Sequence, residues 1–535
     1  MLMQEIELAS GRIRGARRDE AGVLAFKGIP YAAPPVGRLR WRDPEPPVSW
    51  AGIRDAMVFG AGSLAMPMPA GEIFRPSESE DCLTLNVWTA ARDAEERRPV
   101  MVWIHGGGFQ FGSSAMAGND GTHFAADGVV LVSINYRLGV FGFLAHPELD
   151  REGEPSGNFA LLDMIAALRW VKENIAQFGG DPDCVTIFGE SAGAHAIGLL
   201  MASPLAHGLF HRAIGQSGAW WDSEHGPLAS AEEARTRGLA LMRKLGAANI
   251  EDMRAMSASR VNAAGIWNFL TDPGTTAFSP SVDGYVVPDV PGRIFAQGKQ
   301  MSVPLLAGWN RDEHFYFTSR GLPTTPRRFR AAAARQFGAA RMADFDAVYP
   351  SRDGREAKRS ADMLIGDLVI SQQIWSWGGA HRAKGAPTYI YEFHYASGFS
   401  PQPIHTADIP FVFGNLTGNP FRAKGVAPEA GDRAFSKLMR RYWINFSRTG
   451  DPNGEGLPHW PLYEGVGSSV MHLSRNSAAA TETVAARFAF IESFREEGVL
   501  PPNWRAVEAR MSPGMARLAV GLVRFAARFR RLPGR

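Results

Sequence analysis

Residues 185–201 change from strand to helix character across a Gly-x-Ser-x-Gly pentapeptide, and this stretch constrains the fold more than any other. Residues 185–188 are strand-forming (Val-Thr-Ile-Phe), the pentapeptide places Ser191 between two glycines, and a run of small and apolar residues follows. A strand, a sharp turn and a helix in this order are typical of a nucleophile elbow, which exposes the serine hydroxyl. The pentapeptide alone recurs by chance, so the alternative is an ordinary turn with an incidental serine. The flanking strand and helix favour the elbow.

The segments around Ser191 alternate between strand and helix patterns. Residues 99–104 and 129–136 are almost wholly apolar, as expected for central strands buried on both faces. Residues 158–178 carry apolar side chains at helical spacing. This alternation predicts an α/β fold, with a central, mostly parallel sheet and helices on both faces. Ligands bind at the carboxyl ends of the strands in such sheets, and Ser191 follows one of these ends.

Beyond residue 201 the chain adds further strands and long helical stretches. The predicted strands are 303–308 and 388–393, and the predicted helical segments are 228–265 and 435–446. Residues 324–385 contain no strong strand pattern, and we expect a helical insertion there, near the site. The predicted organisation is one domain over residues 1–502 and a separate tail over residues 503–535.

Composition excludes several classes of function. The chain has 535 residues with 57 basic and 54 acidic side chains, a net charge of +3, so no general affinity for nucleic acid is expected. Two cysteines cannot form a disulfide framework for a chain of this length, and no Cys/His cluster in the sequence suggests a metal site. We therefore expect neither metal nor cofactor. The sequence shows no secretory signal pattern and no apolar run of about 18 residues, and a cytoplasmic location is expected.

A serine hydroxyl becomes a good nucleophile only when a base takes its proton and an acid orients that base. Among the ten histidines that follow Ser191, His405 stands out because it lies in a loop just after the strand predicted at 388–393. Asp312 and Glu313 follow the strand predicted at 303–308 and are the candidate acids. Position alone does not decide which of Asp312 and Glu313 is the acid. It also leaves open that these two carboxylates are a solvated loop pair.

A Gly-rich loop follows the strand predicted at 99–104. Residues 105–109 read His-Gly-Gly-Gly-Phe. Three glycines let the backbone bend toward a substrate and direct N–H groups at a developing oxyanion, where each such donor contributes about 2.7–4 kcal/mol. The alternative is a flexible loop, which the buried strand before it and the aromatic residue after it disfavour.

From about residue 9 to residue 465 the chain resembles the type-B carboxylesterase family, which includes the cholinesterases and bacterial para-nitrobenzyl-type esterases. The matching segments, in order, are 26–32 (FKGIPYA), 34–41 (PPVGRLRW), 79–87 (SEDCLTLNV), 105–109 (HGGGF), 135–139 (NYRLG), 157–158 (GN), 178–182 (FGGDP), 189–193 (GESAG), 216–218 (QSG), 312–313 (DE), 405–410 (HTADIP), 445–446 (NF) and 449–453 (TGDPN).

The resemblance implies an α/β-hydrolase fold and a serine carboxylic-ester hydrolase that works through an acyl-enzyme. It implies Ser191 as nucleophile, Glu313 rather than Asp312 as acid, and His405 as base. It also implies that the oxyanion hole is formed by the N–H groups of three residues, Gly107, Gly108 and Ala192. A lipase or a carbamate or amide hydrolase on the same triad is the alternative. Non-catalytic, cholinesterase-like interaction proteins are a second alternative, but these typically lack the serine.

Three positions depart from the family pattern. His314 stands after the acid where the family usually has glycine, and its imidazole could compete for Glu313. The family often pairs the cysteine at position 82 with one about twenty residues earlier, where this chain has Ser63. Asp408 stands where a glutamate is commoner.

Two further expectations concern the substrate pocket and the C-terminal tail. The resemblance implies that Phe109, Trp220 and Trp221 line an acyl pocket suited to uncharged, small to medium or aromatic esters, although each could equally belong to the core. The tail 503–535 has leucines and phenylalanines on one helical face and arginines on another. It could lie on an anionic membrane surface, mediate self-association or pack on its own domain, and the chain could be a monomer or a homodimer.

Overall fold

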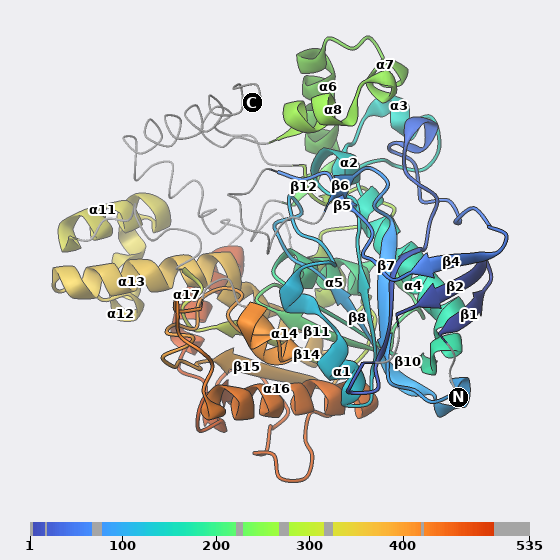
Figure 1. Cartoon of the computed structure of the whole chain (residues 1–535). Helices are drawn as coiled ribbons and strands as arrows, with labels where there is room; N and C mark the ends of the chain where they lie inside the picture. The colour runs from blue at the N-terminus through green and yellow to red at the C-terminus, as the bar shows by residue number, and fades with distance from the viewer. Residues whose placement is uncertain are drawn as a thin grey trace.

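A ten-stranded mixed sheet runs through the computed structural model, which describes residues 4–16, 19–66, 77–220, 228–266, 278–314, 325–418 and 422–496 (Figure 1). From one edge to the other the strands are β17 (Ala478–Thr481), β16 (Ser469–Leu473), β15 (Thr388–Phe393), β14 (Leu305–Asn310), β11 (Arg212–Gln216), β10 (Gly180–Glu190), β8 (Arg98–Ile104), β9 (Val130–Ile134), β7 (Thr84–Thr89) and β3 (Leu24–Pro30). All neighbours from β16 to β9 are parallel, and only the pairs at the two ends are antiparallel. The predicted mostly parallel sheet is confirmed.

Helices cover both faces of this sheet, and the period-two alternation of strand β8 shows how. Val100 and Val102 belong to the core shared with helices α4 (Phe159–Asn174), α5 (Ala192–Ala202) and α14 (Gln372–Arg382). Met101 and Trp103 point the other way, into the core shared with α1 (Thr122–Ala126), α15 (Ile409–Phe413) and α16 (Ala430–Thr449). A strand covered on both faces has no polar side, which is why its sequence reads as a continuous apolar run.

Further helices surround the sheet. Those before β14 are α2 (Gly139–Phe143), α3 (Pro147–Asp150), α6 (Ala231–Leu245), α7 (Ile250–Ala255), α8 (Ala258–Gly265) and α9 (Pro291–Ala296). Between β14 and β15 come α11 (Pro326–Phe337), α12 (Met342–Val348), α13 (Gly354–Gly366), a π-helical turn at Asp367–Ser371, and α14. Helices α11 to α13 lie together at one side of the molecule, and with α17 (Ala485–Glu496) they form an apolar cluster of their own (Figure 1).

The predicted domain boundaries stay a prediction, and the tail 503–535 lies outside the described residues. None of the helices in the described part of the chain is long and apolar enough to cross a membrane. Some strands gave no signal in the sequence. Strand β11 contains a glycine and a glutamine, and β17 is mostly alanine, so each has a single β-branched residue and no aromatic one. Their pairing partners in the sheet decide their conformation.

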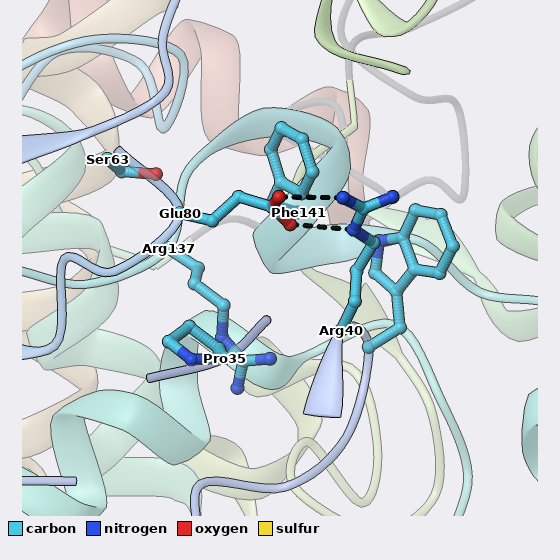
Figure 2. A pocket seen from close by; sticks show the side chains of 7 residues that line it. Pro35, Arg40, Ser63, Glu80, Arg137 and Phe141 are labelled. Carbon is cyan, nitrogen blue, oxygen red and sulfur yellow. Dashed lines mark hydrogen bonds and ion pairs between the residues drawn. The ribbon is translucent and has the colours of Figure 1, made fainter. Parts of the chain in front are cut away.

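A small pocket near the N-terminal loops is enclosed by ion-paired side chains rather than by catalytic groups (Figure 2). Arg40 donates two hydrogen bonds of 2.6 Å to Glu80, and its remaining nitrogen donates to main-chain carbonyls of α7 and the residue after it. Arg137 lines the same pocket and pairs with Asp163 through hydrogen bonds of 2.8 and 2.7 Å. Both pairs fasten loops to the helices beside the sheet.

Ser63 also lines this pocket and lies next to Cys82, where the resemblance places a second cysteine. Its hydroxyl accepts a hydrogen bond from the N–H of Leu138 at 3.0 Å. Cys82 is fully buried, and burial raises the pKa of its thiol to about 12. The hydroxyl of Ser63 therefore takes the place of the disulfide partner, and Cys82 stays an unreactive thiol.

We expect Asp163→Ala to destabilise the fold by about 3–5 kcal/mol, because it leaves the guanidinium of Arg137 buried without its counter-ion. The side chains of Asp163 and Arg137 are 0% and 2% exposed. The matched control is Asp289→Ala, which breaks a pair whose side chains are 44% and 63% exposed and which is expected to cost less than about 1 kcal/mol. Urea unfolding measures both variants, and equal losses would contradict the assignment.

Candidate active site

Ser191 occupies a strained turn between β10 and α5. Its backbone has φ 54° and ψ −122°, a region that L-residues other than glycine rarely adopt. The two glycines of the pentapeptide make this turn possible. A Cβ at Gly193 would lie 2.0 Å from the carbonyl oxygen of Ile104, and one at Gly189 would lie 2.6 Å from the same atom. The turn is thus pressed against the end of β8, and it has the geometry predicted for the elbow.

Glu313 and His405, 92 residues apart in sequence, meet behind this turn. His405 Nδ1 lies 2.6 Å from Glu313 Oε2, and each residue is 1% exposed. The other carboxylate oxygen, Oε1, accepts a hydrogen bond from the N–H of Asn310 at 2.7 Å. Asp312 makes a different contact, because its two oxygens accept hydrogen bonds from Arg311 at 3.0 and 2.9 Å. Of the two candidate acids, only Glu313 contacts the imidazole.

His314 does not compete for this carboxylate. Its Nε2 lies 3.8 Å from Asp362 Oδ2, on α13. Both oxygens of Glu313 are already engaged, one by Asn310 and the other by His405. The unusual imidazole after the acid therefore faces the helical segment and not the buried histidine.

The Gly-rich loop lies directly against the serine. A Cβ at Gly106 would sit 2.6 Å from the carbonyl oxygen of Glu190 and 3.1 Å from Ser191 Cβ. Gly107 and Gly108 have φ of 114° and 60°, which glycine adopts without strain. The N–H groups of Gly107, Gly108 and Ala192 donate to no other residue in the described part of the chain. Three main-chain donors are thus available beside Ser191.

Hydrogen bonds hold this loop in place, so it is not a flexible segment. The Tyr136 hydroxyl donates to the His105 carbonyl at 2.6 Å, and the two rings stack at 4.4 Å between centroids. The N–H of Gly139 donates to the carbonyl of Phe109 at 2.8 Å. Burial lowers the pKa of His105 to about 4, so its ring is neutral and its role in the loop is structural.

The aromatic residues expected in the acyl pocket are packed into the core. Phe109 is 0% exposed and meets Phe143 edge-on at 5.2 Å between ring centroids. Trp220 is also 0% exposed and meets Phe295 edge-on at 4.9 Å. Trp221 lies outside the described residues. A pocket role for these residues stays a prediction.

Asp408, the residue that replaces the commoner glutamate, anchors the turn that carries His405. Its Oδ2 accepts hydrogen bonds from Gln216 at 2.8 Å and from Tyr391 at 3.2 Å, and its Oδ1 accepts one from Asn310 at 3.3 Å. The same Asn310 amide donates to the carbonyl of Ile404 at 2.8 Å, one residue before His405. Although aspartate is shorter than the commoner glutamate, the carboxylate of Asp408 thus accepts hydrogen bonds from three side chains.

Glu190 is a site residue that the sequence reasoning missed. It is 2% exposed, and its Oε1 lies 3.3 Å from His405 Nε2, the nitrogen on the side away from Glu313. Burial raises the pKa of Glu190 above its ordinary value, while the charge of His405 lowers it. Burial alone would lower the pKa of His405, but the carboxylates of Glu190 and Glu313 outweigh it and raise that pKa above its ordinary value. The sequence signal that could have pointed to Glu190 is that a carboxylate stands at the variable position of the pentapeptide, directly before Ser191.

We expect Glu190→Gln to move the acidic limb of kcat/KM against pH to lower pH, by at least about one pH unit. Removing the negative charge beside the imidazole destabilises its protonated form, so the pKa of His405 falls and the neutral base persists to lower pH. The acidic limb of kcat/KM reports this base in the free enzyme. The control is Glu173→Gln, at an exposed position on α4. An unmoved limb, or one moved to higher pH, would contradict the role of the Glu190 charge.

Comparison with known proteins agrees with this geometry. A model of the carboxylesterase family matches residues 3–491 of the chain. The chain is 37% identical over 461 residues to fumonisin B1 esterase of Sphingopyxis macrogoltabida, covering 85% of this chain and 84% of that protein. It is 36% identical over 479 residues to para-nitrobenzyl esterase of Bacillus subtilis (strain 168), covering 86% and 93%. A solved structure of PNB esterase superposes with a TM-score of 0.78 at 32% identity, covering 93% of this chain and 100% of that one.

Similarity of this extent reaches from the first strand to the last helix of the described chain and includes the segments that carry Ser191, Glu313 and His405. It fixes both the architecture and the class of reaction: the chain belongs to the carboxylesterase family and is an ester-hydrolysing enzyme with an α/β-hydrolase fold.

Proposed function

We propose that Ser191, His405 and Glu313 are the catalytic triad of this esterase and that it hydrolyses uncharged esters through an acyl-enzyme. The observation that carries the proposal is the 2.6 Å contact between His405 Nδ1 and Glu313 Oε2, buried beside the strained turn of Ser191. A histidine held by a carboxylate through Nδ1 presents Nε2 as the base for a serine hydroxyl.

In the acylation step, Ser191 Oγ attacks the carbonyl carbon of the ester while His405 Nε2 takes the hydroxyl proton. The carbonyl oxygen becomes an oxyanion, and the N–H groups of Gly107, Gly108 and Ala192 are the donors that stabilise it. Glu313 stabilises the imidazolium that forms. The tetrahedral intermediate then expels the alcohol, which takes the proton from His405 Nε2, and the acyl group stays on Ser191.

In the deacylation step, a water molecule replaces the alcohol. His405 takes a proton from this water, whose oxygen attacks the acyl carbon, and the same N–H groups receive the second oxyanion. Collapse of this intermediate breaks the bond to Ser191 Oγ, which recovers its proton from His405. The products are a carboxylic acid and an alcohol, and the enzyme returns to its starting state.

The charge around the serine supports an uncharged substrate. Glu190, Glu313 and Asp408 are all buried carboxyl groups near His405, so the side chains beside the imidazole are acidic and offer no favourable contact to an anionic ester. Phe109 ends the Gly-rich loop and Trp220 follows β11 by four residues, and both belong to the apolar core beside the site. One relative is named for para-nitrobenzyl esters, and we infer small to medium or aromatic esters as the substrate class here.

The test is hydrolysis of para-nitrophenyl acetate, butyrate, decanoate and palmitate, beside a para-nitrophenyl carbamate and a para-nitroanilide. We expect the highest kcat/KM for the acetate or butyrate, and a burst of para-nitrophenol where deacylation is slow. A preference for palmitate would indicate a lipase, and faster cleavage of the carbamate or anilide would indicate the other alternative. Either result would overturn the proposed substrate class.

We further infer that the enzyme acts in the cytoplasm, where the free thiols of Cys82 and Cys184 would stay reduced. The arginine-rich tail 503–535 could still hold part of it at an anionic membrane surface. Fractionation of cells that express the full chain, or a chain ending at residue 502, tests this. If the same share of both chains is found in the membrane fraction, the tail has no membrane role. Recovery of the enzyme outside the cytoplasm would overturn the inferred location.

A further inference from the structure

A second cluster of ionisable side chains lies three strands away from β10, at the carboxyl ends of β15 and β16. It consists of Glu392, His394 and His472. Adjacent strands are about 4.8 Å apart, so roughly 14 Å of sheet separates this cluster from the strand that leads to Ser191. The triad does not use it.

Strand register brings the three side chains together. Glu392 and His472 are direct partners in the parallel pair of β15 and β16, so they lie on the same face of the sheet. His394 is two residues beyond Glu392, and its N–H continues the pairing by donating to the carbonyl of Leu473 at 2.8 Å. Residues two apart on an extended chain share a face, so all three side chains project the same way.

The polar atoms of the cluster converge on one point. Glu392 Oε2 lies 3.0 Å from His394 Nε2 and 3.7 Å from His472 Nε2, and all three atoms lie within 4.8 Å of one another. In a tetrahedral zinc site with bonds of about 2.0–2.2 Å, neighbouring ligand atoms are about 3.3–3.6 Å apart. The two observed separations bracket that spacing.

The two imidazole nitrogens are buried and incompletely paired. His472 Nε2 makes no hydrogen bond with any residue the structure describes, and the polar contact of His394 Nε2 is the one with Glu392 at 3.0 Å. The two rings stack at 4.6 Å between centroids, and both nitrogens lie near the same carboxylate oxygen. Buried polar atoms normally have a partner, and one cation shared by all three groups would satisfy them together.

The charges around the cluster allow a cation. Arg487 and Arg311 are the guanidinium groups that act on Glu392. Arg487 Nε donates to Asp367 at 2.8 Å, and Arg311 is held by Asp312 at 2.9 and 3.0 Å, so each positive charge has a carboxylate of its own. With neutral imidazoles the cluster itself carries the single negative charge of Glu392.

We propose that Glu392, His394 and His472 bind one Zn²⁺ ion. Two imidazole nitrogens and one carboxylate oxygen suit this borderline cation better than Mg²⁺ or Ca²⁺, which prefer oxygen ligands. The side chains of His394 and His472 are 25% and 26% exposed, so the cluster lies close to the protein surface. The ion joins β16 to β15 at the start of the loop that ends at His405, and its role is to fasten that loop.

The experiment is calorimetric titration of Zn²⁺ into the full chain, prepared without a histidine tag and stripped with a chelator. We expect one ion per chain for the wild type and an affinity at least tenfold lower for His472→Gln and for Glu392→Gln. Esterase activity shows that the variants are folded. Zn²⁺ should also raise the midpoint of thermal unfolding of the wild type, but not that of His472→Gln.

Two control variants test whether the ion binds at this cluster and not elsewhere. His459→Gln removes an exposed histidine outside the cluster and should leave the affinity unchanged. Glu190→Gln removes a carboxylate beside His405, and a loss of affinity there instead of in His472→Gln would put the ion in the active site. That result would overturn the proposal, as would a wild type that binds no Zn²⁺, an equal loss in His459→Gln, or wild-type affinity in both cluster variants.

Discussion

Replacing Ser191 with alanine is expected to lower kcat for para-nitrophenyl butyrate by about 10⁶-fold, the loss that follows removal of the nucleophile in a serine hydrolase. The hydroxyl is the only group of this side chain that can form the acyl-enzyme, and the residual rate comes from the N–H donors and substrate binding alone. Steady-state kinetics at saturating ester measures the effect.

The matched control for this variant is Ser203→Ala, at the C-terminal end of the helix that Ser191 begins. Ser203 is 2% exposed, and its hydroxyl has no hydrogen-bond partner among the described residues, so alanine fits and kcat should stay within about twofold. A Ser191→Ala enzyme that kept more than about one tenth of the wild-type kcat would contradict the assignment of the nucleophile.

Glu313→Gln is expected to lower kcat by about 10⁴-fold, while Asp312→Asn stays within about threefold. Glu313 Oε2 lies 2.6 Å from His405 Nδ1, and only a carboxylate there both fixes the tautomer and stabilises the imidazolium. An amide can donate to Nδ1 and stabilise the wrong tautomer. Asp312 instead binds Arg311 and has 23% of its side chain exposed.

The neighbouring acids therefore form a matched pair of variants with the same chemical change one residue apart. Kinetics of both enzymes on one ester, together with thermal unfolding to show equal folding, decides between them. A collapse of kcat in Asp312→Asn with little effect in Glu313→Gln would show that the orienting acid has been misassigned.

The sequence predicted those parts of the site that are contiguous in the chain. The turn at Ser191 and the Gly-rich loop after β8 each combine a strand with the glycines that its end requires, so their local structure could be read directly. His405 could be placed because it follows a strand. The choice between Asp312 and Glu313 could not be made from spacing, because adjacent side chains in a loop point in different directions, and only packing sets which one meets the imidazole.

Glu190 and the cluster on β15 and β16 were missed for a different reason. The direction of the Glu190 side chain depends on the strained turn and on a histidine 215 residues further along the chain. Glu392 and His472 meet only through the register of two strands, and the strand at β16 was not among those predicted from the sequence. The expectation that the chain lacks a metal site rested on spacing along the sequence, which does not report contacts across a sheet.

The most direct test of the triad is covalent labelling by an organophosphate ester, followed by peptide mass spectrometry. We expect one phosphoryl group per chain, attached to the peptide that contains Ser191, with esterase activity lost in proportion to labelling. Ser191→Ala should take up no label, and Glu313→Gln should take it up far more slowly than Asp312→Asn. Stoichiometric labelling of another residue, or full activity in the labelled enzyme, would contradict the assignment of Ser191 as the nucleophile of the triad.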